Sequence, residues 1–581
     1  MNTSDLIADR LIDWGVEVVF GLPGDGINGM MEALRKRKDK IKFILVRHEE
    51  GAAFSAVGYA KFTGKLGVCL ATSGPGGLHL LNGLYDAHLD NAPVLAITGN
   101  TYSDLIGSRY QQDVDLLAPF SQVAGFNHLV MNASHARMAV DIACKHAISC
   151  RDVGHISIPI DIQEQDLSEA HVSQHKVLKA TSNVLTSSIA AADRRMVREA
   201  ASILDQGKKI VILVGAGALG AGEEVLELAG KLQAPVVKAL LGKAVIPDES
   251  PYSLGGLGLL GTAPSEEAMQ EADTLLMVGS SIPFSDFLPR PGQAVGIQID
   301  IRPDRIGIRY PIKVGLVGDA RSTLRELIRE VSRKEDGRFL KSMQKRMKEW
   351  WKLMEASGTR TDSPLKPQVV AWTLSDLLAD DAIVCADSGT NTFWAALGIK
   401  IRAKQSFSVS GTLASMANGV SYAIGAQTGH PGRQVVAFVG DGGFSMLMAE
   451  FSTAVRYNLP IKVIVIKNGA LEMIRWEQIG FLGHPAYGVD FQDIDFVKFA
   501  EACGGVGFRI ERYEEVRGVL STALKEPRPC IVEAVVDPNE PPHPSTMKME
   551  YAGKFAKALL KGEPSGGKIG LTLYRDRMKA L

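Results

Sequence analysis

Two polar residues stand at the ends of neighbouring apolar runs, at a spacing that suits a metal site. Residues 435–440 form a strand-like run that ends at Asp441, and residues 461–466 lead to Asn468, 27 residues after Asp441. Parallel strands would bring this carboxylate and this amide oxygen to one sheet edge, and Mg²⁺ favours such oxygen ligands together with phosphate. A Gly-Asp-Gly sequence also occurs in ordinary turns, but glycines beside the aspartate would let a diphosphate approach the backbone.

Two further motifs lie in the first part of the chain. Residues 46–53 end one strand-like run and open a helix, with Glu49 at the junction. Acidic residues are favourable at any helix N-terminus, so this position alone assigns no chemistry. Residues 72–79 hold three glycines, a proline and His79 after another strand-like run. This composition predicts a tight turn, which is either a helix entry or a loop that a ligand approaches.

The middle of the chain carries a glycine-rich loop. Residues 215–220 match the G-x-G-x-x-G pattern of dinucleotide-binding loops and follow an apolar run. A nicotinamide site would need an acidic residue at the end of the next strand. That run, residues 234–238, ends in Lys238, so the loop does not predict a nicotinamide site.

These motifs fall in three blocks that alternate strand-like runs with amphipathic helical stretches. We expect domains at residues 1–180, 190–335 and 365–540, followed by a tail at residues 547–581. The alternation predicts the α/β class, with a doubly wound parallel sheet in each domain. A basic stretch with two tryptophans, residues 333–354, predicts a linking helix. The predicted strands include residues 18–20, 42–46, 66–70, 93–98, 210–214, 234–238, 274–278, 295–299, 435–440 and 461–466.

Composition narrows the functional class. The 581 residues are 46% hydrophobic and 22% charged, which allows several large cores. A net charge of −1 argues against binding to nucleic acid. The six cysteines form no CxxC pair, as is typical of reduced residues in a cytoplasmic protein. Residues 1–14 do not resemble a signal peptide, and no apolar run reaches the roughly 18 residues of a membrane span.

In their order and spacing, the motifs resemble those of the thiamine-diphosphate enzymes, in particular pyruvate oxidases and acetolactate synthases. The resemblance covers residues 1 to about 540 and is greatest for the bacterial quinone-dependent pyruvate dehydrogenase branch. It implies a pyrimidine-binding domain, a central FAD-binding-type domain and a domain that binds diphosphate and Mg²⁺. The implied metal ligands are Asp441, Asn468 and the backbone carbonyl of Ala470. Relatives often have glycine at the position of Glu472, and we expect this glutamate to reshape the following turn.

The resemblance also implies catalytic residues. Glu49 matches the glutamate that hydrogen-bonds the aminopyrimidine ring and so promotes loss of the thiazolium proton. His79 falls where pyruvate oxidases place a histidine, and Gln111 falls where relatives place a glutamine that faces the substrate. Glu477 matches another position near the substrate. For His79 and Gln111 a purely structural role stays open.

Further residues are implied as cofactor contacts. Met416, 25 residues before Asp441, would wedge between the two rings of thiamine diphosphate, although core packing is the commoner role of methionine. The other implied thiamine diphosphate contacts are Gly440, Gly442, Gly443 and Ile474. The implied FAD contacts are Gly215, Gly217, Gly242, Lys243, Gly279, Ser280, Asp300, Ile301 and Asp319. The alternative for the central domain is a fold without flavin.

The activity that the resemblance implies is oxidative decarboxylation of pyruvate or a related 2-oxo acid to acetate or acetyl phosphate, with electrons passed from FAD to a quinone or O₂. The first alternative is an acetolactate synthase-like carboligase in which FAD is structural. A second alternative is a nucleotide-binding scaffold without catalysis. Absence of flavin reduction by the keto acid would favour the carboligase.

The resemblance implies an assembly as well. In relatives the site lies between subunits, so we expect homodimers paired into homotetramers. The tail, residues 547–581, carries apolar and basic residues that could form an amphipathic helix on the inner face of a membrane. We favour the alternative that the tail packs on its own enzyme and covers the mouth of the active site, because residues 562–567 interrupt the helical face.

Overall fold

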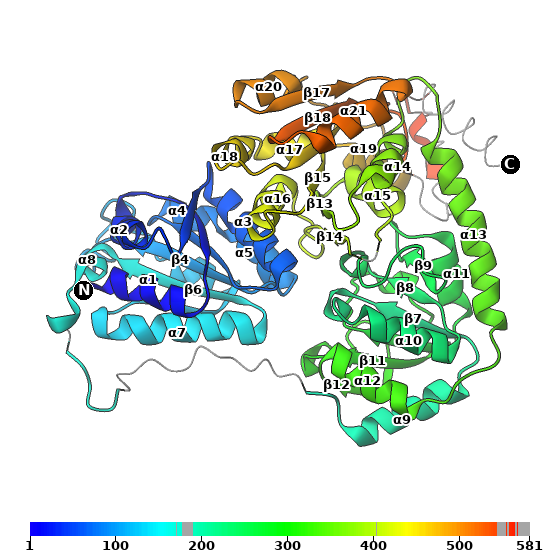
Figure 1. Cartoon of the computed structure of the whole chain (residues 1–581), viewed down its shortest axis with the longest axis horizontal. Coiled ribbons are helices and arrows are strands. Elements are labelled where there is room, and N and C mark those ends of the chain that lie inside the picture. Colours follow the sequence, from blue (N-terminus) through cyan, green and yellow to red (C-terminus); the bar gives the residue numbers. More distant parts are fainter. Residues whose placement is uncertain are drawn as a thin grey trace.

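The computed structural model describes residues 1–169, 171–176, 190–402, 404–542, 553–554, 557–559, 561–563 and 566. Within these residues the chain forms three six-stranded sheets, one in each predicted block. The paired strands of each sheet run parallel. Figure 1 shows the first block (blue to cyan) beside the third (yellow to orange), with the second (green) against the third. The predicted α/β class, with three doubly wound sheets, is confirmed.

The first sheet has the strand order β2-β1-β3-β4-β6-β5. Its strands are β1 (Val18–Leu22), β2 (Lys42–Leu45), β3 (Gly67–Ala71), β4 (Val94–Asn100), β5 (Ala124–Leu129) and β6 (Val153–Pro159). The helices of this block are α1 (Thr3–Asp13), α2 (Asn28–Lys36), α3 (Glu49–Thr63), α4 (Pro75–His79), α5 (Leu81–Leu89), α6 (Leu117–Phe120), α7 (Ala133–Cys150) and α8 (Ile160–Glu164).

The second sheet has the order β12-β11-β10-β7-β8-β9. Its strands are β7 (Ile210–Val214), β8 (Val236–Lys238), β9 (Ser253–Gly256), β10 (Thr274–Val278), β11 (Val295–Asp300) and β12 (Ile312–Val317). The helices are α9 (Arg194–Gln206), α10 (Gly222–Leu232), α11 (Ala263–Glu271) and α12 (Ala320–Glu330).

The third sheet has the order β14-β13-β15-β16-β18-β17. Its strands are β13 (Ile383–Ala386), β14 (Ser406–Ser408), β15 (Val435–Gly440), β16 (Lys462–Lys467), β17 (Val506–Ile510) and β18 (Cys530–Val535). The helices are α14 (Pro367–Leu377), α15 (Thr390–Gly398), α16 (Asn418–Gly429), α17 (Asp441–Met446), α18 (Glu450–Arg456), α19 (Glu472–Trp476), the π-helix η7 (Glu477–Leu482), α20 (Phe496–Ala502) and α21 (Tyr513–Lys525).

Burial explains why the central strands could be predicted. Every residue of β4, β7 and β10 is buried, because helices cover both faces of a parallel sheet. Such strands appear in the sequence as continuous apolar runs. The observed β8 begins at Val236, two residues later than predicted, and the residue before it is Pro235, which has no N–H for the ladder.

Each sheet has a central point from which the strand order first runs outward in both directions. In the first sheet it lies between β1 and β3, in the second between β7 and β10, and in the third between β13 and β15. Loops at the carboxyl ends of such strand pairs diverge, and ligands bind there in open α/β sheets. The fold therefore offers three positions for ligands.

The predicted linking helix is α13 (Arg338–Gly358), which runs along the outer side of the second and third blocks (Figure 1). Trp350 is buried, and the rings of Trp351 and Trp372 lie 6.3 Å apart. The Lys400 ammonium lies 4.5 Å from the centroid of each of these two rings. The two tryptophans of α13 thus pack on neighbouring elements. Among the described helices, none is long and apolar enough to cross a membrane.

Helices α3 and α16 join the first and third blocks, and they cross through glycines. A Cβ atom on Gly58 would lie 2.6 Å from the Tyr422 Cα, and one on Gly425 would lie 2.1 Å from the Ser55 carbonyl oxygen. One hydrophobic cluster contains buried residues of both blocks, including Phe54 and Ile424. The close crossing therefore sets how the first block sits on the third.

This crossing yields a stability prediction. Gly425→Ala should lower the free energy of unfolding by about 1–3 kcal/mol, because the added methyl group meets the backbone of α3. Gly518→Ala in α21 is the matched control, since no atom lies within 4 Å of its added Cβ. The control should be neutral or stabilising by up to about 1 kcal/mol. Urea unfolding of both variants measures the difference, and equal stabilities would contradict the tight crossing.

Candidate functional site

Asp441 and Asn468 meet at the carboxyl ends of β15 and β16, as the sequence predicts. The buried Asp441 carboxylate accepts the Gly469 N–H at 2.7 Å and the Gly442 N–H at 3.0 Å. The Asn468 Oδ1 atom accepts the Ala470 N–H at 3.0 Å. All three predicted metal-binding residues line one large cavity of about 2160 Å³. Their carboxylate, amide and carbonyl oxygens are the donors that Mg²⁺ prefers.

Glu472 is an unanticipated part of this site. Its carboxyl group is buried, and its Oε2 atom accepts hydrogen bonds from the Asn468 Nδ2 atom at 2.6 Å and the Thr390 Oγ1 atom at 2.7 Å. Glu472 therefore connects the segment after β16 to the start of α15. The nitrogen of the Asn468 amide is held by this contact, so the amide oxygen is left for other partners.

Burial dominates the electrostatics of the acidic pair. It raises the pKa of Asp441 to about 6 and the pKa of Glu472 to about 8, because a charge in a desolvated position is costly. Backbone N–H groups around Asp441 and the Thr390 hydroxyl beside Glu472 partly offset these shifts. A bound cation would favour the charged forms of both acids.

The other predicted thiamine diphosphate contacts line the same cavity. Met416 is half-buried, and Ile474 is 43% exposed. Glu477 begins the π-helix η7, a conformation that is rare and frequent at functional sites. A Cβ on Gly443 would lie 2.5 Å from the Asp387 carboxylate, so glycine is needed for packing as well as for ligand approach. The lining residues among these predictions are Met416, Gly440, Gly442, Gly443, Ile474 and Glu477.

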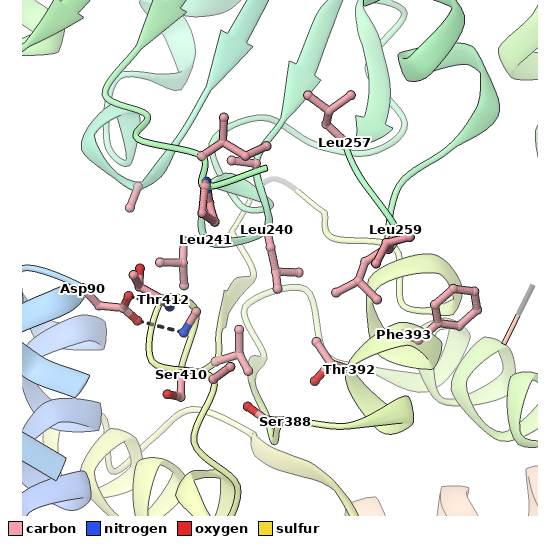
Figure 2. A pocket seen from close by; sticks show the side chains of 18 of the residues that line it. Asp90, Leu240, Leu241, Leu257, Leu259, Ser388, Thr392, Phe393, Ser410 and Thr412 are labelled. Carbon is pink, nitrogen blue, oxygen red and sulfur yellow. Dashed lines mark hydrogen bonds between the residues drawn. The ribbon is translucent and has the colours of Figure 1, made fainter. Parts of the chain in front are cut away.

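The central block contributes the opposite wall of the cavity. Figure 2 shows Leu240, Leu241, Leu257 and Leu259 of this block facing the third block across the space. The predicted FAD contacts that line the cavity are Gly215, Gly217, Gly279, Ser280, Asp300, Ile301 and Asp319.

The glycines of this wall pack loop on loop. The Gly217 N–H donates to the Gly279 carbonyl at 2.9 Å, and a Cβ on Gly215 would lie 2.4 Å from the same oxygen. Gly279 has a φ of +55°, which favours glycine. The loops after β7 and β10 thus cross at the point where the strand order reverses.

Gly242 and Lys243, also predicted as FAD contacts, are not among the described residues that line the cavity. The Lys243 ammonium lies 3.2 Å from the Asp248 Oδ2 atom and donates to the Ala396 carbonyl at 2.8 Å. A Cβ on Gly242 would lie 2.6 Å from the Val214 carbonyl oxygen. In this structure both residues hold the second block together and against the third. Asp319 also has a local role, because its Oδ1 atom caps α12 through the Ser322 N–H at 2.8 Å.

The predicted catalytic residues of the first block form a separate group. Glu49 is buried at the start of α3, and its Oε2 atom lies 2.9 Å from the His79 Nδ1 atom. The rings of His48 and His79 stack at 4.5 Å. None of Glu49, His79 and Gln111 is among the described residues that line the large cavity. Within one chain, the cavity therefore brings together the predicted site residues of the second and third blocks. The Glu49 group is not part of its lining.

The loop that carries Gln111 differs from expectation in one detail. Gln111 is exposed, whereas the neighbouring Gln112, with a φ of +59°, accepts a hydrogen bond from the Ser73 hydroxyl at 2.5 Å. A Cβ on Gly74 would lie 2.9 Å from the Gln112 Cβ. Gln112 therefore packs on the glycine-rich turn beside Glu49. The only signal in the sequence for this contact is that Gln111 and Gln112 are adjacent glutamines.

Part of the predicted tail can be placed. Ala558 is fully buried against Trp476 and Ile479, and the Glu563 Oε2 atom accepts the Ala486 N–H at 2.8 Å. The Lys561 Nζ atom lies 2.9 Å from the His484 Nδ1 atom. These described residues pack beside α19 and η7, which line the cavity. Most of the predicted tail, residues 547–581, lies outside the described residues, and so does most of the amphipathic helix that it could form.

Comparisons with known proteins agree with this architecture. Family profiles described as the thiamine pyrophosphate enzyme N-terminal TPP binding domain, central domain and C-terminal TPP binding domain match residues 1–118, 197–327 and 387–534, respectively. The chain belongs to the thiamine pyrophosphate enzyme family. Thiamine pyrophosphate and thiamine diphosphate are two names for the same cofactor.

Individual relatives cover nearly the whole chain. A putative thiamine pyrophosphate-containing protein YdaP of Bacillus subtilis is 40% identical over 575 residues, which are 99% of this chain and 98% of that protein. A pyruvate oxidase of Lactiplantibacillus plantarum is 30% identical over 94% of this chain and 90% of its own length. A probable acetolactate synthase large subunit of Methanococcus aeolicus is 31% identical over 93% and 92%, respectively.

The contacts of Glu472 yield a prediction about metal affinity. Glu472→Ala should weaken Mg²⁺ binding in the presence of thiamine diphosphate by about 10–100-fold, because the Asn468 amide loses the partner that orients it. Glu472→Gln keeps an oxygen that accepts from both Asn468 and Thr390, so it should stay within a few-fold of the parent protein. Isothermal titration of the metal-depleted protein measures both. Equal losses in the two variants would show that the charge, and not the hydrogen bonding, is needed.

Proposed function

We propose that the protein is a thiamine-diphosphate- and FAD-dependent oxidoreductase. It would decarboxylate pyruvate or a related 2-oxo acid to acetate or acetyl phosphate and pass electrons to a quinone or O₂. The observation that carries the proposal is the single cavity that joins the loops of the second block to Asp441 and Asn468. Its volume of about 2160 Å³ exceeds the roughly 300–1,000 Å³ of a pocket for one drug-sized ligand. Two cofactors can therefore lie in contact within it.

The third block has the donors that thiamine diphosphate and Mg²⁺ need. Asp441, the Asn468 amide oxygen and the Ala470 carbonyl would hold Mg²⁺, and through it the diphosphate. Met416 lies at the same cavity and would support the bent cofactor. When bound, thiamine diphosphate supplies the electron sink that decarboxylation of a 2-oxo acid requires. Glu472 would keep Asn468 oriented.

The second block has the features that FAD needs. The loop crossing at Gly215, Gly217 and Gly279 leaves backbone without side chains at the edge of the cavity. Asp300 and Asp319 line the same wall and would hold the ribose and adenine. Burial raises the pKa of Asp300, and hydroxyl donors of a bound ligand would offset this shift by stabilising the carboxylate. The roles of Gly242 and Lys243 at FAD remain predictions, because in the structure both residues contact other parts of the protein.

Glu49 does not line the cavity of its own chain, and a second copy would bring its Glu49 there. Glu49 of one chain would then face the Asp441 side of its partner in a homodimer, and dimers would pair into tetramers. Large apolar side chains are exposed in segments that carry predicted site residues, including Tyr110 (49%), which precedes Gln111, and Leu482 (62%) and Tyr487 (88%), which follow Glu477. Contact between copies would cover such side chains.

Acetolactate synthesis is the second candidate. The Methanococcus relative with that printed name is 31% identical, which is close to the 30% of the pyruvate oxidase. In this case FAD would be structural, and a second keto acid would take the place of the oxidant. A non-catalytic scaffold is the third and weakest candidate, because Glu49, Asp441 and Asn468 are all present at the positions that catalysis and metal binding would need.

The surroundings of the enzyme are also proposals. We place it in the cytoplasm, with the described part of the tail packed beside α19 and η7 near the mouth of the cavity. Peripheral contact of the tail with the inner face of a membrane is the alternative. Liposome co-sedimentation that falls when residues 547–581 are deleted would favour membrane contact.

Anaerobic stopped-flow absorbance tests the reaction. With thiamine diphosphate and Mg²⁺ present, pyruvate should bleach the flavin band, and Glu49→Gln should slow this by at least about 100-fold because proton transfer is lost. A flavin band that stays oxidised while CO₂ and acetolactate form would establish the carboligase instead. No flavin band in the purified protein would overturn the FAD assignment.

Complementation tests the shared site. Glu49→Gln and Asp441→Ala chains should each be inactive alone. Co-expressed chains should recover about a quarter of the parent activity, because half of randomly paired dimers are mixed and each of these has one intact site of two. The control is a chain that carries both substitutions, co-expressed with either single variant. No recovery in the mixture would show that one chain holds a complete site.

A further inference from the structure

All three blocks meet at one loop. Residues 409–417 connect β14 to α16, and six of them line the cavity: Val409, Ser410, Gly411, Thr412, Ala414 and Met416. Gly411 lies against Leu241 of the second block, where an added Cβ would be 2.5 Å from the Leu241 Cγ atom. Asp90 of the first block reaches the same loop (Figure 2). The loop also carries Met416, the residue proposed to support the bent cofactor.

The loop adopts a conformation that its own sequence does not favour. Ala414 has a φ of +56° and Ala417 a φ of +73°, in the left-handed region that is costly for residues with a Cβ. Such backbone persists only where surrounding contacts determine it. Asp387 provides one contact, since its Oδ2 atom accepts the Ala417 N–H at 3.1 Å. The others come from the first block.

Residues on one face of α5 form hydrogen bonds with the loop. Asn82, Asp86 and Asp90 are spaced by four residues, so they lie along the same side of the helix and its end. The Asn82 amide donates to the Ser415 hydroxyl oxygen at 2.9 Å. The two Asp90 carboxylate oxygens accept the Gly411 and Thr412 N–H groups, both at 2.9 Å. Figure 2 shows the Asp90 side chain directed at Thr412.

Lys61 of α3 contacts both Asp90 and the loop. Its Nζ atom lies 2.7 Å from the Asp90 Oδ2 atom and donates to the Val409 carbonyl at 3.0 Å and the Tyr422 hydroxyl at 2.6 Å. The Asp90 side chain is fully buried. Burial alone would raise the pKa of Asp90, but Lys61 and the backbone donors outweigh burial and hold the pKa below its usual value. Asp90 is therefore a buried, charged and fully hydrogen-bonded group, in which each partner depends on the other.

We propose that Asp90 and Lys61 are positioning residues that set the conformation of the 409–417 loop and so place Met416 against the thiamine ring system. The inference rests on the proposed function, because it takes Met416 to contact the cofactor. Neither residue needs to touch the cofactor. Their effect passes through the two backbone N–H groups and the carbonyl that they hold.

Cofactor geometry in the loaded protein tests this role. Asp90→Asn keeps the shape of the side chain but replaces an acceptor oxygen by an N–H₂ group, and Lys61→Met removes the ammonium. Each variant should weaken thiamine diphosphate binding by about tenfold and should change or abolish the near-ultraviolet circular dichroism band of the bound aminopyrimidine. The rate with substrate should fall by about 10–100-fold, as expected for a misplaced reacting group.

Two controls separate positioning from general destabilisation. Tyr457→Phe removes another contact between the first and third blocks, the acceptance of the Leu45 N–H at 2.8 Å, without touching the loop. It should leave cofactor affinity and the dichroism band within twofold of the parent protein. Lys61→Arg keeps the charge and should restore most of the band that Lys61→Met loses.

The outcomes distinguish this inference from the proposed function. A parent protein that does not bind thiamine diphosphate would overturn the proposed function itself. A parent protein that binds it normally, with Asp90→Asn and Lys61→Met showing the parent band and affinity, would overturn the positioning role alone. Losses in Tyr457→Phe equal to those in Asp90→Asn would assign the effect to loosened packing of the two blocks and would also overturn the inference.

Discussion

Parallel strands must all end at the same edge of their sheet, and the rest of this structure depends on that constraint. It gathers the loops that follow the strands at one edge, and the reversal of strand order leaves a gap between two of them. In the second and third blocks these gaps face each other, so the loops at Gly215 and Gly279 share one cavity with Asp441 and Asn468. The proposed contact between FAD and thiamine diphosphate follows from the way the gaps of the second and third sheets face each other.

Much of the fold could be predicted because parallel strands are buried on both faces. The runs at residues 210–214, 274–278 and 435–440 coincide with β7, β10 and β15, where continuous burial leaves a continuous apolar signal. The edge strands gave weaker signals, since only two residues of β12 and one residue of β17 are buried. The ends of strands shifted where backbone chemistry intervened, as at Pro235.

The residues of the candidate site could be predicted where the end of a strand places them. They could not be predicted where a contact with a residue distant in the fold determines their role. The spacing of Asp441 and Asn468 indicated their meeting, because both follow adjacent strands. Nothing in the sequence indicated that Glu472 would hold Asn468, since the expected effect was a changed turn. The side chain of Lys243 pairs with Asp248 and does not line the cavity. A buried ammonium group is costly unless it is paired with an opposite charge, and Asp248 supplies that charge. The roles assigned to these residues stay proposals.

Helix α3 has Glu49 at its first position and Lys61 within its last turn. In the proposed dimer these two ends would belong to different active sites: Glu49 to the site completed by the partner, and Lys61 to the loop of its own chain. The helix is a rod of about 18 Å between them, at about 1.5 Å per residue. Its glycine contacts with α16 leave it little room to slide or tilt. One fixed helix would therefore set the position of the Met416 loop in one site and of the glutamate in the other, so the two active sites of a dimer would share one structural element.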